Sequence, residues 1–400
     1  MSMQKNIVDE TFPEALKILS DLIKFQTVSG TSNLALIEYC EKRLSKVGAS
    51  SFRTSDDEKK RFNLFSTVNG KSKVNGGGII LSGHTDVVPA SAKEWSADPF
   101  ISKEKNNKVY GRGTCDMKGF IATTIAAAEI LKNKKLNLPV HFSFTYDEEI
   151  GCFGARHLSE ELKQYKFKPS MVIIGEPTSM EIIEAHKGDC EYTTCFHGME
   201  GHASNPEKGL SAIQYGSLFT NKLFELADEL KKRAPSDSPF DPPWSTIQAG
   251  KIDGGVAHNV IAGQCLIDWE MRPINDEDKN FVKQNLSSYC ENKLMPEMQS
   301  KFSKAKIETK IIGEIPGLIP KKNNEARVIM QELLQSNSTG VISFGTEAGI
   351  FQEMDMDVVV CGPGSIDQAH KANEYISLSE LEKSIQNLLK LFDQWSKKTI

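Results

Sequence analysis

The chain has no long apolar run, no closely spaced pair of cysteines and no excess of basic charge. Its eight cysteines are too few among 400 residues for a disulfide scaffold, and none has the Cys-x-x-Cys spacing of a zinc knuckle or a thioredoxin-like redox site. No segment approaches the length that spans a bilayer, and the N-terminus lacks the continuous apolar stretch of a signal peptide. We therefore expect a protein of the reducing cytoplasm.

The charge balance argues against two classes of partner. The sequence holds 48 lysines and arginines against 53 aspartates and glutamates, which gives a net charge of -5. Nucleic acids and anionic membranes favour proteins with a basic excess, so we expect neither as a partner. Hydrophobic residues make up 39% and charged residues 25%, as in ordinary globular proteins, and the length predicts two or three domains.

The first helix is predicted to begin near residue 11. Thr11-Phe12-Pro13-Glu14 has the pattern of a capping box with proline in the first turn. Leu16, Leu19 and Ile23 then follow at the spacing of an apolar helix stripe. The pattern therefore predicts an amphipathic helix close to the start of the chain.

Four short apolar runs each lead to residues that can ligate metals or transfer protons. They are 79–81 before His84, 140–144 before Asp147-Glu148-Glu149, 171–174 before Glu176, and 358–360 before His370. Continuous apolar runs suit strands that are covered on both faces, and helix-like stretches separate them. We therefore predict an α/β fold with a doubly wound, mostly parallel sheet. Ligands bind at the carboxyl ends of the strands in such sheets, so we expect these side chains to meet at one edge.

From residue 188 to 312 the pattern of elements changes. Predicted strands and helices follow one another as β-α-β-β-α-β, which is the order of a ferredoxin-like α+β unit. The fourth apolar run and His370 lie beyond this segment, so we predict that it is inserted into the larger domain. The expected domains are 1–187 together with 313–400, and the insertion 188–312.

Taken one at a time, the polar residues at the strand ends have ordinary structural interpretations. His84-Thr85-Asp86 is typical of a solvated turn, and Asp116, between a strand-like and a helix-like segment, suits a helix N-cap. The three acids at 147–149 suit an exposed acidic turn, and Glu176 and His370 each suit a structural role. If each of these interpretations were correct, the five residues would have come together at one edge of a single sheet by chance.

Taken together, the same residues fit a pair of metal ions. Two histidines, one bridging aspartate and two glutamates complete two hydrolytic metal sites and leave a position for water between them. Adjacent acids repel one another unless a cation is present, and one glutamate can bind metal while its neighbour takes a proton from water. Imidazole combined with carboxylates suits zinc, with cobalt or manganese as substitutes.

Six ordered motifs carry a resemblance to a known family. They are SGHTDVVP at 82–89, GRGTCDMKG at 111–119, DEEIGCFGAR at 147–156, GEPT at 175–178, GMEGHAS at 198–204 and GPGSIDQAHKANEY at 362–375. The sequence resembles the M20 family of dizinc amidohydrolases from near its N-terminus to about Ile376. The resemblance implies that the inserted segment acts as a lid and dimerisation domain, and hence that the protein is a homodimer.

The resemblance also gives each residue of the expected centre a role. The implied ligand sets are His84, Asp116 and Glu176 for one zinc ion, and Asp116, Glu149 and His370 for the other. Asp86 would orient His84, and Glu148 would act as the general base. A cis peptide bond after Asp116 is implied as well.

Three residues of the inserted segment are implied to contact the substrate. His202, supplied by the partner subunit, would donate to the developing oxyanion, while Asn259 and Arg272 would bind the substrate's α-carboxylate. Arginine suits this task because its planar guanidinium binds a carboxylate through two hydrogen bonds. Without the resemblance, we would interpret His202 as a turn residue, Asn259 as part of a strand-end turn and Arg272 as half of a surface ion pair.

Within the family, the sequence most resembles the acetylornithine deacetylases. Cys115, Ala185-His186-Lys187-Gly188, Thr346-Glu347-Ala348 and the run 362–370 carry this resemblance. It implies hydrolysis of N2-acetyl-L-ornithine, a small N-acyl amino acid, to L-ornithine and acetate in arginine biosynthesis. Glu347 is predicted to pair with the cationic side-chain amine of ornithine, with a helix N-terminal acid as the alternative.

Two other functions stay open at this point. Other M20 activities use the same metal pair, among them succinyl-diaminopimelate desuccinylase, aminoacylase and carboxypeptidase chemistry. A catalytically silent metal-binding scaffold is the non-enzymatic alternative. It would lack a ligand or the base, and here every expected position is filled.

Overall fold

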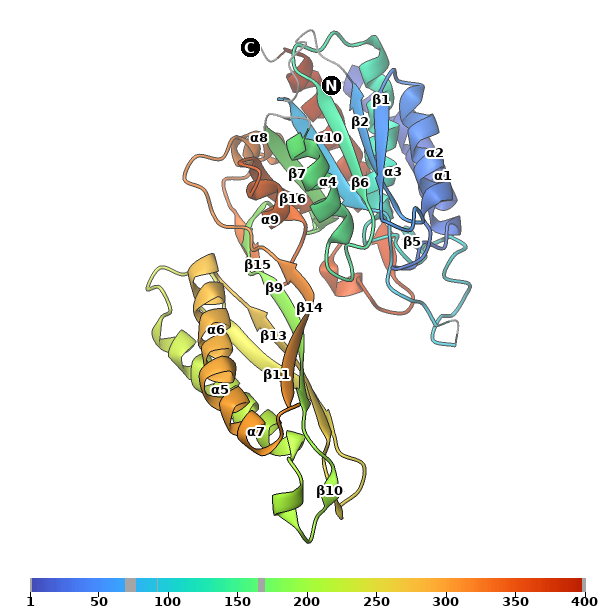
Figure 1. Ribbon diagram of the computed structural model, residues 1–400. Coiled ribbons are helices and arrows are strands. Elements are labelled where there is room, and N and C mark those ends of the chain that lie inside the picture. Colours follow the sequence, from blue (N-terminus) through green and yellow to red (C-terminus); the bar gives the residue numbers. More distant parts are fainter. Residues whose placement is uncertain (1, 69–76, 92, 165–169, 398–400) are drawn as a thin grey trace. The chain divides into compact units, whose positions relative to one another are not determined.

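The computed structural model describes residues 2–68, 77–91, 93–164 and 170–397 (Figure 1). The chain divides into two compact units. The first consists of Met1–Ala185, Pro320–Gly340 and Thr346–Ile400, and the second of His186–Ile319 with Val341–Gly345. In sequence, the second unit is therefore an insertion into the first.

An eight-stranded mixed sheet runs through the first unit. Its strand order is β1 (Ser50–Ser55), β2 (Phe62–Val68), β6 (Val140–Thr145), β3 (Ile79–His84), β7 (Met171–Pro177), β16 (Asp357–Gly362), β8 (Ile183–His186) and β15 (Gly340–Ile342). The central strands β6, β3, β7 and β16 are parallel, whereas β1, β2 and β8 form antiparallel pairs. Every residue of β3, β6 and β7 is buried, as expected for strands covered on both faces. The fold class predicted from the apolar runs is confirmed.

Helices cover both faces of this sheet (Figure 1). One face shares an apolar core with α1 (Ser2–Lys24), α2 (Leu34–Ser45), α3 (Lys118–Ala128), α8 (Glu325–Leu334) and α10 (Leu378–Lys397). The other face packs against α4 (Phe153–Gln164) and α9 (Ala348–Gln352). The two layers bury the central strands, and so the polar ends of those strands are held on a rigid framework.

Helix α1 begins earlier than the capping-box pattern predicts. It starts at Ser2 and continues through Pro13, and the Thr11 hydroxyl donates to the Ile7 carbonyl. Val8 is buried in the same core as the later apolar residues, so packing extends the helix upstream of the predicted start. Pro13 is exposed, where water can reach the backbone carbonyl that a proline leaves without a donor. The predicted helix start was therefore wrong.

The second unit contains a four-stranded antiparallel sheet with two long helices on one face (Figure 1). The strand order is β11 (Thr246–Gly254), β13 (Gln264–Arg272), β9 (Asp189–His197) and β14 (Lys306–Ile315). Together with α5 (Ala212–Lys232) and α6 (Asp276–Tyr289), the strands follow the chain order β-α-β-β-α-β. This connectivity and strand order are those of the predicted ferredoxin-like unit. Buried residues alternate along β9 and β13 and pack under the helices.

Smaller elements complete the two units. The second unit also holds a two-stranded sheet of β10 (Gly201–His202) and β12 (Val260–Ile261). The first unit holds a three-stranded sheet of β17 (Tyr375–Ser377), β5 (Lys108–Tyr110) and β4 (Lys103–Lys105). Within the ranges given above, no helix is long and apolar enough to cross a membrane.

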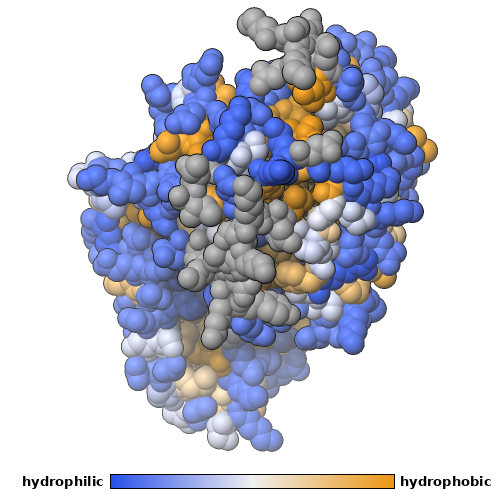
Figure 2. Space-filling view, turned by 90° about the horizontal axis from the view of Figure 1, so that it is seen from above, coloured by the Kyte–Doolittle hydropathy of each residue, from blue (hydrophilic) through white to orange (hydrophobic). Residues whose placement is uncertain are grey.

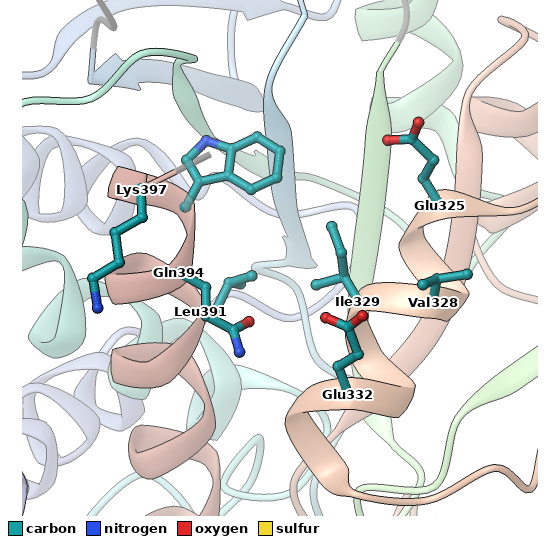
Figure 3. Close-up of a pocket in the computed structure, with 8 residues that line it drawn as sticks. Glu325, Val328, Ile329, Glu332, Leu391, Gln394 and Lys397 are labelled. Carbon is teal, nitrogen blue, oxygen red and sulfur yellow. The ribbon is translucent and has the colours of Figure 1, made fainter. Parts of the chain in front are cut away.

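The surface seen in Figure 2 is mostly hydrophilic, with apolar side chains gathered in small patches. One groove lies between α8 and α10, and Val328, Ile329, Leu391 and Trp395 are among the residues that line it (Figure 3). Its lining includes none of the histidines and acids at the strand ends. The predicted chemistry therefore lies elsewhere in the first unit.

Candidate metal centre

The carboxyl ends of the parallel strands bring the predicted ligands to one edge of the sheet. His84 is the last residue of β3, and Glu176 lies within the last two residues of β7. The acids 147–149 follow β6, and His370 follows β16. Because these strands are parallel and adjacent, residues from distant parts of the chain arrive at the same place.

Asp116 lies between the two histidines. Its Oδ1 atom is 2.9 Å from His84 Nε2, and its Oδ2 atom is 3.4 Å from His370 Nε2. Glu176 Oε1 is 3.7 Å from His84 Nε2, and Glu149 Oε2 is 2.8 Å from His370 Nε2. The structure thus brings together all five residues expected as ligands, in two groups that share Asp116.

Asp116 reaches this position from the loop that precedes α3. The helix begins after Met117, so Asp116 does not occupy the N-cap position that its sequence context suggested. Its side chain is buried and faces the two histidines. The peptide bond between Asp116 and Met117 is cis, as the family resemblance implied.

The donor set suits divalent metal ions. The groups His84, Asp116, Glu149 and His84, Glu148, Glu176 each offer ligand atoms within 4.8 Å of one another. In the part of the chain that the structure describes, Asp116, Glu149 and Glu176 form ion pairs with histidines and none with lysine or arginine. Buried carboxylates gathered with no lysine or arginine among them repel one another, and divalent cations would relieve that repulsion.

Burial and mutual repulsion shift the pKa values of these side chains. Burial raises the pKa of Glu148 and of Glu176 well above the ordinary glutamate value, and neighbouring carboxylates raise it further. Burial also raises the pKa of Asp116, but hydrogen bonds with His370 and His84 outweigh burial and lower it below its ordinary value. The pKa of His370 rises to about 10 because Asp116 and Glu149 accept hydrogen bonds from its ring. The cluster therefore favours positive charge, either protons on imidazole or bound cations.

The three consecutive acids have three different environments. Asp147 is engaged by an ion pair with Arg61. Glu149 contacts a histidine of the cluster. Glu148 forms no salt bridge within the described residues, and Cys152 Sγ lies 3.7 Å from its Oε1 atom. Of the three carboxylates, only that of Glu148 forms no ion pair in this part of the chain, although it lies within 4.8 Å of His84.

Asp86 holds the acid-bearing loop as well as lying beside His84. The His84 Nδ1 atom is 3.0 Å from the backbone oxygen of Asp86 and 3.6 Å from its carboxylate. The nearer backbone oxygen therefore accepts the ring N–H, which leaves Nε2 to face the cluster. The Asp86 carboxylate accepts hydrogen bonds from the backbone N–H groups of Glu148 and Glu149, at 3.1 and 3.3 Å, and from the Ser29 hydroxyl at 2.7 Å. Its side chain thus fixes the loop more directly than it fixes the imidazole.

Glu347 is buried at the N-terminal end of α9. Its residue is 1% exposed, and its Oε2 atom is 3.5 Å from the Ser82 hydroxyl of β3. Burial raises the pKa of Glu347 to about 7. It occupies the N-cap position of α9, but its side chain makes no capping hydrogen bond. Its Oε1 atom accepts no well-formed hydrogen bond among the described residues, although the Thr145 hydroxyl lies near enough to lower the pKa of Glu347.

The residues expected to contact substrate from the inserted segment lie at two ends of the second unit. His202 and Asn259 lie together on and beside the small sheet of β10 and β12. Arg272 is the last residue of β13, where it pairs with Asp189 and Glu270. Strand β13 begins beside the small sheet and is nine residues long, so its two ends lie about 26 Å apart. One substrate of amino-acid size cannot reach both ends of a single unit.

Two charged side chains that the sequence did not single out support the cluster. Arg61 pairs with Asp147, and Glu374 accepts hydrogen bonds from the backbone of the loop that carries Asp116. No sequence signal marks Arg61, which lies in a charged turn. Glu374 lies in the quoted motif at 362–375, but a motif does not say which atoms its acid contacts.

The fold and the clustered side chains define a metallohydrolase of the α/β class. The family described as Peptidase family M20/M25/M40 matches residues 80–394. Acetylornithine deacetylases from Pasteurella multocida and Proteus mirabilis are 33% and 32% identical to this chain over 96% of its length, and the matches cover 98% and 97% of those proteins. The chain therefore belongs to peptidase family M20/M25/M40.

Solved structures of other proteins share the fold. A family M20 metallo-carboxypeptidase from Sulfolobus solfataricus has a TM-score of 0.74 at 17% sequence identity, and the match covers 96% of this chain and 100% of that one. A dipeptidase from Saccharomyces cerevisiae has a TM-score of 0.72 at 15% identity, and the match covers 100% of this chain and 99% of that one.

Proposed function

We propose that this protein removes the acetyl group from N2-acetyl-L-ornithine and releases L-ornithine and acetate. The observation that carries the hydrolytic part of the proposal is the Asp116 carboxylate between two histidines, each of which faces a glutamate. The choice of substrate is supported by full-length similarity to acetylornithine deacetylases. This reaction belongs to arginine biosynthesis. All eight cysteines lie in described residues and are free thiols, which suits the reducing cytoplasm as its location.

The proposed cofactor is a pair of divalent metal ions, zinc with cobalt as a substitute. His84, Asp116 and Glu176 would hold one ion, and Asp116, Glu149 and His370 would hold the other. When bound, the ions supply Lewis-acid chemistry and lower the pKa of water so that it attacks at neutral pH. Mixed imidazole and carboxylate donors suit zinc, whereas calcium and magnesium take oxygen donors.

Glu148 is the proposed general base. Its neighbours Asp147 and Glu149 form ion pairs with basic side chains. Within the described residues, Glu148 forms none. Burial raises its pKa, which suits a group that takes a proton from the attacking water and then gives it to the leaving amine. Asp86 supports this role by accepting the backbone N–H of Glu148 and so holding its loop.

The substrate contacts are proposed to come from two copies of the chain. Arg272 and Asn259 would hold the α-carboxylate, and His202 would donate to the oxyanion. The separation of about 26 Å between the ends of the second unit supports a homodimer in which one copy supplies Arg272 and the other supplies His202 and Asn259. The exposed apolar side chains of Ile213 and Phe224 on α5 support an interface on the inserted unit.

Glu347 is proposed to bind the cationic side-chain amine of ornithine. Its buried carboxylate keeps one oxygen that accepts no well-formed hydrogen bond among the described residues, and an ammonium group would donate a charge-assisted hydrogen bond to it. Glu347→Gln should therefore raise KM for acetylornithine selectively. An equal loss on uncharged N-acetyl amino acids would contradict this role.

A substrate panel combined with metal analysis tests the proposed function. The protein is stripped of metal, reloaded with Zn²⁺ or Co²⁺, and assayed on acetylornithine, succinyl-diaminopimelate and acetylmethionine. We expect kcat/KM for acetylornithine to exceed the others by about 100-fold or more, because an unmatched polar group in the pocket is penalised. A preference for succinyl-diaminopimelate would contradict the proposed substrate but would agree with the proposed hydrolytic centre. No turnover in protein with two bound ions would indicate a silent scaffold.

A further inference from the structure

Glu374 is a buried acid that accepts four hydrogen bonds and is not one of the proposed ligands. Its residue is 1% exposed. Its Oε1 atom accepts from the backbone N–H of Cys115 at 2.8 Å and of Asp116 at 3.1 Å. Its Oε2 atom accepts from the Gly113 N–H at 2.9 Å and from the Arg112 guanidinium at 2.7 Å. Each carboxylate oxygen is therefore occupied by two donors.

The four donors belong to one short loop between β5 and α3. The backbone N–H groups of Gly113, Cys115 and Asp116 turn toward one point and form a nest for an anion. Gly113 has a φ of +84°, a conformation that favours glycine and lets the chain curve around the carboxylate. The Gly111 N–H adds a hydrogen bond to the backbone oxygen of Glu374 at 3.0 Å. The position of the loop, and of Asp116 at its end, therefore depends on Glu374.

Glu374 also belongs to the segment that carries His370. Both residues lie between β16 and β17, whereas Asp116 and Glu374 are 258 residues apart in the sequence. The neighbouring Asn373 is held in turn, because its Oδ1 atom accepts from the Ser96 N–H at 2.9 Å and hydroxyl at 2.6 Å. One carboxylate thus joins the Asp116 loop to the His370 segment.

We infer that Glu374 is a positioning residue that fixes Asp116 relative to His370 and so sets the affinity for the ion that these two residues would share. The inference rests on the proposed pair of metal ions and is independent of the substrate. Strands β3 and β7 hold His84 and Glu176, so Asp116 is the one proposed ligand of their ion that depends on Glu374, whereas Asp116 and His370 both belong to the segments that Glu374 joins. Loss of the Glu374 carboxylate should therefore lower the affinity for the ion at Glu149 and His370 more than the affinity for the ion at His84 and Glu176.

Stepwise metal binding tests the inference without substrate. Metal-free protein is titrated with Zn²⁺ against a chelating indicator, and the step that involves His370 is identified as the one removed by His370→Ala. In Glu374→Gln, an amide replaces one acceptor oxygen, so we expect this step to lose about 10-fold or more in affinity and the other step less than about 3-fold. Glu374→Asp keeps the charge with a shorter reach and should fall between Glu374→Gln and the unaltered protein.

Glu380→Gln is the matched control. Glu380 also accepts a backbone N–H, that of Gly364 at 3.1 Å, and its hydrogen bonds among the described residues do not include the Asp116 loop. It should bind both ions with unchanged affinity.

The possible results separate this inference from the proposed function. Unchanged affinities in folded Glu374→Gln, or equal weakening of both steps, would overturn the positioning role and leave the two-ion centre intact. Unaltered protein that binds fewer than two ions would contradict the centre itself. If Glu374→Gln does not fold, Glu374→Asp provides the same comparison, and unchanged affinity in that variant overturns the inference as well.

Discussion

At the scale of single residues, neighbours rather than chemical type distinguish one acid from the next. Asp147, Glu148 and Glu149 carry nearly equivalent groups and are consecutive in the chain. Arg61 forms an ion pair with the first, a histidine forms one with the third, and the second forms none within the described residues. Different surroundings give carboxylates different pKa values and hence different tasks. No pattern of residue types in the sequence contains this distinction.

Replacing Glu148 by Gln should separate proton transfer from metal binding. Glutamine keeps the size of the side chain but cannot accept the proton, so we expect kcat to fall by about 10²–10⁴-fold. Both ions should remain bound, since the proposed ligands are other residues. Metal content and kcat measured on the same sample check this expectation. Glu149→Gln is the contrasting variant and should lose metal affinity together with activity. Turnover close to normal in Glu148→Gln would remove this residue from the mechanism.

His141 should make stability depend on pH, independently of the metal centre. Its Nε2–H donates to the Gly77 carbonyl at 2.9 Å, and its Nδ1 atom accepts from the Thr67 hydroxyl at 2.9 Å. Burial lowers the pKa of His141 to about 4, so the folded state keeps the ring neutral while the unfolded state takes up a proton below about 6.5. The stability contributed by the neutral ring is complete above that pH and is lost as the pH falls toward 4. The loss amounts to about 3 kcal/mol over this window.

Urea unfolding of the metal-free protein between pH 7 and 4 measures this contribution. His141→Gln should flatten the decline in the free energy of unfolding across the window, whatever its effect at pH 7. The same substitution at His258, which is exposed, serves as the control. An unchanged slope in His141→Gln would show that other groups cause the acid sensitivity.

At the scale of secondary-structure elements, burial decides which parts of the fold can be predicted from the sequence. Strands β3, β6 and β7 are covered on both faces, so they appear as continuous apolar runs and were predicted. Strand β1 is largely exposed or half-buried and leaves no such run. Four of the five expected ligands were also found because they follow the ends of predicted strands. Asp116 differs, because it sits in an irregular loop whose place depends on the distant Glu374. Asp116 entered the predicted set as the bridging aspartate and through the family resemblance, without a strand end to place it.

The start of α1 shows how packing overrides a local signal. The capping-box pattern predicted a start near Pro13, whereas burial of Val8 extends the helix upstream and leaves Pro13 inside it. A proline in the first turn is favourable, but in a helix interior it removes a hydrogen bond. The two possibilities therefore differ in what substitution of Pro13 does.

Pro13→Ala should stabilise the protein by about 1–2 kcal/mol, because it restores the missing hydrogen bond and adds helix propensity, less the entropy that proline removes from the unfolded chain. Thermal or urea unfolding measures the change. Lys17→Ala, in the same helix, is the control and should be close to neutral. Destabilisation by Pro13→Ala would instead agree with a helix that begins at the proline.

At the scale of the whole molecule, the proposed metal ligands lie in one unit and three of the four proposed substrate contacts lie in the other, Glu347 being the exception. The histidines and acids of the cluster all belong to the first unit, and His202, Asn259 and Arg272 all belong to the second. The placement of Arg272 and His202 at opposite ends of β13 makes the proposed homodimer testable without a structure of the assembly.

Mixed dimers should recover activity that each parent lacks. His202→Ala and Arg272→Ala are expected to be nearly inactive alone. In a dimer that contains one chain of each kind, one site would lack both residues and the other would be complete. We therefore expect about half of the normal rate in mixed dimers purified through two different affinity tags. If both residues acted within one chain, each site would carry one defect and the mixture would stay inactive. Dimers of a single variant prepared with the same tags provide the baseline.

Strand β16 enters the sheet between β7 and β8, although both of those strands precede the whole inserted unit in the chain. The inserted unit is therefore synthesised before the strand that fills this gap in the sheet. His370 follows the inserted unit in the chain, so the proposed set of ligands is incomplete until that unit has been synthesised. A chain cut short upstream of His370 would lack one of the proposed ligands.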